Sequence, residues 1–108
     1  MSYDILNERK TRTNERIEDI LPREELLCQL AEEASELAQA ALKLRRVTDG
    51  TNPTPVTYDN ALGDVYEEAA DVILCLQLCG IDISSSIVNN TIDRKIKRWL
   101  TRLGESRE

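Results

Sequence analysis

The stretch "ELLCQLAEEASELAQAALKLRRV", residues 25–47, predicts a long amphipathic helix. Its apolar residues recur every three or four positions, a spacing that places them along one side of an α-helix. Pro22 suits the first turn, where its missing N–H is not needed, and Lys43, Arg45 and Arg46 suit the negative C-terminal end of the helix dipole. We therefore expect a helix from about residue 22 to 47, with an inward side made of Leu27, Leu30, Ala34, Leu37, Ala41 and Leu44.

The same spacing recurs in "LGDVYEEAADVILCLQLCG", residues 62–80, and again near the end of the chain. We expect a second helix from about residue 60 to Gly80, capped by Thr57 or Asp59. Its inward residues are predicted to be Leu62, Val65, Ala69, Val72, Leu76 and Cys79. A last helix is expected to begin at Asp82 or Ser84 and to end at Gly104, with an inward side made of Ile87 or Val88, Ile92, Ile96, Trp99 and Leu103.

The composition agrees with packing of helix on helix. Apolar residues make up 41% of the chain, yet Phe is absent and there are few of the aromatic residues that strands favour. We expect an all-α fold, an antiparallel helical bundle formed by residues 22–108 after an N-terminal arm or short helix at residues 1–21. Residues 48–60 are expected to form a loop. Because a chain of 108 residues buries a limited core, a four-helix-bundle core completed by oligomerisation is expected, as a homodimer or a dimer of dimers.

Charge and residue counts disfavour several classes of function. A net charge of −6 argues against binding to nucleic acid or to acidic membranes, and no apolar run reaches the roughly 18–20 residues that cross a bilayer. Three cysteines without a signal-like N-terminus predict free thiols and a cytoplasmic protein. The absence of His removes the usual general base and disfavours a zinc site.

Two pairs of acidic residues lie beside the predicted inward sides of the first two helices. Glu33 and Glu36 are three residues apart in "EEASEL" (32–37), and Glu68 and Asp71 repeat that spacing in "EEAADVILCL" (67–76). Residues three apart are neighbours on a helix surface, so the side chains of each pair can converge. None of the four is followed four residues later by Lys or Arg, the spacing that forms an ion pair within one helix.

Four carboxylates brought together by two antiparallel helices would repel one another strongly. A hard divalent cation with oxygen ligands relieves that repulsion, so we expect a Mg²⁺ site, with Mn²⁺ as a substitute. A Mg²⁺ ion that keeps several waters typically serves the phosphates of a substrate. The alternative from another class of protein is a helical dimerisation or regulatory module without catalytic activity, whose acidic residues are solvated surface.

The acidic pairs resemble the EExxE and ExxD signature of the MazG-like all-α nucleoside triphosphate pyrophosphohydrolases. The similarity spans residues 24–103 and comprises "EEASEL", "EEAADVILCL", then "GIDI" (80–83) and "KIKRW" (95–99). The resemblance implies that an activated water attacks a nucleoside triphosphate, so that pyrophosphate leaves and a nucleoside monophosphate remains. It also implies the catalytic residues, which are the four Mg²⁺ ligands Glu33, Glu36, Glu68 and Asp71.

In the same resemblance, Lys95 and Arg98 fall where MazG-like chains place a Lys and an Arg that contact phosphates. A triphosphate needs cations beyond the metal, and these two are one helical turn apart. Glu36 or Glu32 could serve as the base. Since "EEAADVIL" is also similar to phosphoribosyl-ATP pyrophosphohydrolases, that activity is the nearest enzymatic alternative.

Overall fold

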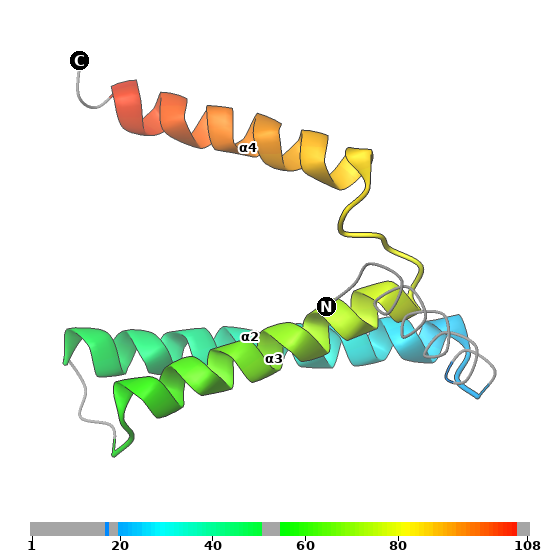
Figure 1. Cartoon of the computed structure of the whole chain (residues 1–108), viewed down its shortest axis with the longest axis horizontal. Helices are drawn as coiled ribbons and strands as arrows, with labels where there is room; N and C mark the ends of the chain where they lie inside the picture. The colour runs from blue at the N-terminus through cyan, green and yellow to red at the C-terminus, as the bar shows by residue number, and fades with distance from the viewer. Residues whose placement is uncertain (1–16, 18–19, 51–54, 106–108) are drawn as a thin grey trace, which may run out of the picture.

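The computed structural model describes residues 17, 20–50 and 55–105. These residues form the helices α2 (Arg23–Asp49), α3 (Tyr58–Leu78) and α4 (Ser86–Glu105), without any strand. Helices α2 and α3 lie side by side and run antiparallel, whereas α4 stands apart from the pair (Figure 1). The all-α prediction is therefore confirmed. Most of the predicted arm at residues 1–21 and the middle of the 48–60 loop lie outside the described residues.

The ends of α2 and α3 follow from local chemistry. Helix α2 runs two residues beyond the expected Val47 and stops at Gly50, whose φ of 67° favours glycine and whose N–H donates to the Arg46 carbonyl. Helix α3 begins after Thr57, whose hydroxyl accepts a hydrogen bond from the Asn60 N–H at 3.1 Å. Thr57, and not Asp59, is thus the cap.

Helix α4 begins at Ser86, a few residues later than the predicted start at Asp82 or Ser84. The Asp82 carboxylate does not cap the helix, because it accepts hydrogen bonds from the N–H of Ser84 at 2.9 Å and from its hydroxyl at 2.6 Å. These bonds close a tight turn before the helix, a common competing use of Asp side chains. The hydroxyl of Ser85 instead accepts the N–H of Val88 at 3.3 Å.

The buried side of α2 differs from the predicted one. Leu27 is 45% exposed and Ala34 and Ala41 are also exposed, whereas Leu26 and Ala40 are buried. The strip that faces α3 is therefore rotated by part of a turn from the predicted side, and it comprises Leu26, Leu30, Glu33, Leu37, Ala40 and Leu44. The rotation brings Glu33 from the edge of the strip to its middle.

Helix α4 contacts neither α2 nor α3 among the described residues. Its predicted inward side is open to solvent: Ile92 is 46% exposed, Ile96 49%, Trp99 64% and Leu103 49%. The prediction that this side packs inward is wrong within one chain, because the connection at residues 79–85 directs α4 away from the pair (Figure 1). No helix among the described residues is long and apolar enough to cross a membrane.

Candidate functional site

The strips by which α2 and α3 face one another have the same spacing. The half-buried or buried positions that match the strip of α2 are Ala61, Val65, Glu68, Val72 and Cys75 on α3, followed by Cys79 just after its end. Glu68 occupies the place on α3 that Glu33 occupies on α2. The two helices run antiparallel (Figure 1), so the middles of the two strips meet. Their carboxylates come close together as a result.

Three predicted site residues come together in this way. Glu33, Glu36 and Glu68 each offer a carboxylate oxygen, and these oxygens lie within 4.8 Å of one another. Glu33 and Glu68 are half-buried and Glu36 is exposed. Asp71 is not part of this carboxylate cluster, although it is half-buried one turn beyond Glu68 on α3. The three side chains of the cluster could hold a metal ion.

Two oxygens of the carboxylate cluster lack hydrogen-bond donors. The Oε1 atom of Glu33 accepts a hydrogen bond from Nε2 of Gln29 at 2.9 Å. The Oε2 atoms of Glu33 and Glu68 are buried and find no hydrogen-bond partner among the described residues. An anionic oxygen without water or a donor is costly, and close like charges raise the cost further. The cluster could therefore hold a positively charged ligand, and Gln29, which donates to one of its carboxylates, was not among the residues that the sequence analysis named.

The predicted phosphate-binding residues lie away from this cluster within one chain. Lys95 and Arg98 are exposed on α4, which does not contact α2 or α3. The cations nearest to the carboxylates in the described structure are instead on α2. A groove of about 510 Å³ joins Glu36, Lys43 and Arg46 of α2 to Asp64 and Glu68 of α3. The signal in the sequence is the seven-residue step from Glu36 to Lys43, which returns to nearly the same side of a helix.

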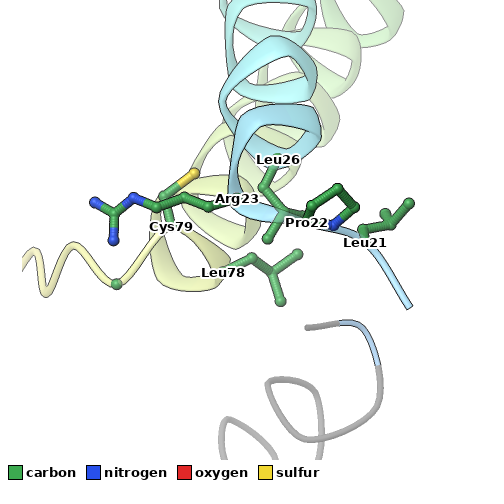
Figure 2. A pocket seen from close by; sticks show the side chains of 7 residues that line it. Leu21, Pro22, Arg23, Leu26, Leu78 and Cys79 are labelled. Atoms are coloured by element: carbon green, nitrogen blue, oxygen red, sulfur yellow. The ribbon is translucent and has the colours of Figure 1, made fainter. Parts of the chain in front are cut away.

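A second hollow, of about 290 Å³, lies where α2 begins and α3 ends. Figure 2 shows Leu26 and Leu78 in this hollow, with Pro22 beside them. Among the described residues that line it, Arg23 alone is charged. The two ends of the α2–α3 pair thus differ, since one bears a groove of mixed charge and the other an apolar hollow.

The cysteine thiols differ in their surroundings. Cys28 is exposed, whereas Cys75 and Cys79 are buried, and all three are free. Burial raises the pKa of the Cys75 thiol above its ordinary value, and the negative charge of Glu33 raises it further. A raised pKa leaves less thiolate at any pH below it.

We expect iodoacetamide at pH 8 to alkylate Cys75 at least roughly tenfold more slowly than Cys28. Burial restricts access of the reagent to Cys75, and the raised pKa lowers the fraction of its thiolate. Peptide mass spectrometry over time measures the two rates. Equal rates in the folded protein would contradict the buried position of Cys75, and equal rates in urea provide the control.

Comparison of this chain with protein families, with curated proteins and with solved structures finds no match.

Proposed function

We propose that the protein is a Mg²⁺-dependent nucleoside triphosphate pyrophosphohydrolase that converts a (d)NTP into a (d)NMP and pyrophosphate. The observation that supports this most is that Glu33 and Glu68, two members of the carboxylate cluster, each have a buried oxygen without a hydrogen-bond partner among the described residues. Carboxylate oxygens without donors fit a hard cation better than they fit solvent. The acidic motifs, which resemble those of MazG-like enzymes, add the substrate class.

Glu33, Glu36 and Glu68 would hold the Mg²⁺ ion, with Asp71 one turn away as the fourth acidic residue of the motif. When bound, Mg²⁺ neutralises phosphate charge and lowers the pKa of a coordinated water. The oxygen of a water attacks the α-phosphorus, the bond to the bridging oxygen of the β-phosphate breaks, and pyrophosphate leaves. Of the two candidate bases, Glu36 and Glu32, we favour Glu36 as the acceptor of the proton of that water, because it is exposed and belongs to the cluster, whereas Glu32 does not belong to it.

We also propose that the protein is a homodimer or a dimer of dimers in which α4 packs on α2 and α3 of another copy. The apolar stripe of α4 is exposed within one chain, and a contiguous exposed apolar patch is typical of a surface that binds another protein. The charges are complementary: Arg94, Lys95, Lys97, Arg98 and Arg102 lie on α4, while α3 contains acidic residues but no basic one. In this arrangement Lys95, beside the apolar stripe, would lie closer to the carboxylate cluster of the neighbouring copy, and Arg98, further round α4, would approach it through its long side chain.

A panel of canonical and modified NTPs and dNTPs tests the function. The purified protein is incubated with each nucleotide and Mg²⁺, and pyrophosphate release is followed beside a reaction with excess EDTA. We expect Mg²⁺-dependent release from at least one nucleotide, with the nucleoside monophosphate as the other product. Phosphoribosyl-ATP belongs in the panel, because turnover of that compound alone would assign the alternative activity. If no nucleotide is turned over and Mg²⁺ does not stabilise the protein, the non-catalytic dimerisation or regulatory module would be the better explanation.

Gln29 is expected to orient Glu33 for metal binding. Replacing Gln29 by Leu removes the 2.9 Å hydrogen bond to Glu33 Oε1 and leaves that oxygen without its donor. Because partners of metal ligands typically contribute 10- to 100-fold to metal affinity, we expect Mg²⁺ to bind about tenfold more weakly. Calorimetric titration with Mg²⁺ measures the change. The control is Gln77→Leu on α3, because Gln77 lines neither the groove nor the hollow. Equal affinities in the two variants would remove Gln29 from the site.

A further inference from the structure

The carboxylate cluster lies between two unlike ends of the α2–α3 pair. On one side is the groove that contains Lys43 and Arg46, and on the other side is the apolar hollow lined by Leu26 and Leu78. A ligand with one strongly anionic end and one less polar end would therefore bind across the cluster in one direction only. Its anionic end would lie in the groove, because two cations, Lys43 and Arg46, line the groove and one, Arg23, lines the hollow.

The position of Lys43 brings its ammonium group towards the carboxylates. Seven residues correspond to about 700° of rotation, so Lys43 lies within about 20° of Glu36 around the axis of α2. Helical side chains lean towards the N-terminus, and Lys43 therefore leans back towards Glu36. Arg46 follows one turn later and lines the same groove.

Both cations are available to a ligand. The Nζ atom of Lys43 lies 3.7 Å from Oδ2 of Asp64, and the two side chains are 35% and 50% exposed. Such a long, half-exposed ion pair contributes little and is readily exchanged. Arg46 forms no ion pair with any described residue. Arg45 differs from both cations, because its side chain is 78% exposed and its Nε atom lies 3.5 Å from Oδ2 of Asp49. Arg45 also does not line the groove.

We propose that Lys43 and Arg46 bind the phosphate chain of the substrate, an inference that rests on the proposed pyrophosphohydrolase function and gives its substrate a direction. The phosphates extend from the carboxylate cluster into the groove, and the nucleoside lies on the opposite side. The carboxylates of Glu36, Asp64 and Glu68 oppose the two cations in the groove, so a polyphosphate binds here only together with a divalent cation.

Calorimetry with inorganic tripolyphosphate tests whether Lys43 and Arg46 bind phosphates, and it does so without a nucleotide and without turnover. The full-length wild-type protein is titrated with tripolyphosphate in the presence and absence of Mg²⁺, and Lys43→Ala, Arg46→Ala and the matched control Arg45→Ala are titrated in the same way. We expect each of the first two substitutions to weaken binding roughly tenfold, because each removes a charge-assisted contact to phosphate. The control should bind as the wild type does. Binding of Mg²⁺ alone should be unchanged or tighter in both variants, since a repelling positive charge has been removed.

Asp64→Asn separates a direct contact from an indirect one. This variant breaks the ion pair with Lys43 but keeps the cation, so tripolyphosphate should bind as tightly as it does to the wild type or more tightly. If Asp64→Asn weakened binding as much as Lys43→Ala, Lys43 would act by holding the helices and the inference would be wrong. The inference would also fall, with the proposed function intact, if the wild type releases pyrophosphate while Lys43→Ala and Arg46→Ala match Arg45→Ala. A wild type that neither binds tripolyphosphate nor hydrolyses any nucleotide would overturn both.

Discussion

Replacing Glu68 by Gln is expected to lower kcat for pyrophosphate release by roughly 100- to 1,000-fold, the scale typical of removing one electrostatic stabiliser. The substitution keeps the shape of the side chain and removes one charge from the centre of the carboxylate cluster. It also turns the buried Oε2 of Glu68 into an amide group, which binds a hard cation more weakly than a carboxylate does. The measurement is steady-state pyrophosphate release with the nucleotide that the wild type prefers.

The melting temperature gives a second readout of the same variant. A ligand that binds only the folded protein at 100 times its Kd adds about 2.7 kcal/mol of stability, and each kcal/mol raises Tm by about 4–8 °C in a domain of this size. Mg²⁺ should therefore stabilise the wild type and lose most of that effect in Glu68→Gln. Without Mg²⁺ the variant should melt at or above the wild type, because repulsion within the cluster has been reduced.

Glu67→Gln is the matched control for these measurements. Glu67 is the exposed neighbour of Glu68, has the same side chain and lies outside the carboxylate cluster. It should retain both turnover and stabilisation by Mg²⁺. Equal behaviour of the two variants would contradict a metal site at Glu68.

If α4 forms the interface of the proposed oligomer, replacing Ile96 by Asp is expected to dissociate it. Ile96 lies at the middle of the apolar stripe formed by Ile92, Ile96, Trp99, Leu100 and Leu103, all of which are exposed in a single chain. If this stripe packs on another copy, the substitution buries an unpaired carboxylate at the centre of the interface. A loss of more than about 2 kcal/mol in the free energy of association corresponds to an affinity at least roughly thirtyfold weaker.

Light scattering after size-exclusion chromatography at several protein concentrations measures the change in mass. The control is Thr101→Asp, which introduces the same charge on the opposite side of α4. There the Thr101 hydroxyl donates a hydrogen bond to the Lys97 carbonyl of its own helix. The oligomer of this control variant should therefore persist. A wild-type protein that is monomeric at all concentrations would contradict the proposed assembly. A wild-type oligomer that Ile96→Asp leaves unchanged would place the interface elsewhere.

Turnover in mixed samples tests whether α4 completes the site of another copy. Neither Glu68→Gln nor the double variant Lys95→Ala and Arg98→Ala should be active alone. If one copy supplies the carboxylates and the other supplies α4, mixing the two variants should restore part of the activity, because some mixed assemblies contain an intact site. Activity in the mixture that is no greater than the sum of the separate variants would mean that α4 does not serve the site in this way.

Local pattern was sufficient to predict most of the secondary structure. The three-and-four spacing of apolar residues predicts α2, α3 and α4 within a few residues of their observed bounds, because each helix is long and strongly periodic. Caps were harder to predict, since Asp82, Ser84 and Ser85 can each make local hydrogen bonds and the choice among them depends on the path of the chain. Convergence of the two acidic motifs was predicted, and the structure brings Glu33, Glu36 and Glu68 together.

The sequence by itself determined that the chain is helical, that two helices carry acidic pairs with the same spacing, and that α4 has an apolar stripe. These are properties of single helices, which the periodicity of side chains specifies. Only the tertiary structure decided that the α2 strip is rotated so that Glu33 lies in its middle, that Lys43 and Arg46 share a groove with Glu68, and that α4 leaves the pair. The physical reason is that rotation and contact between helices depend on the surfaces that meet, and one helix alone does not contain that information.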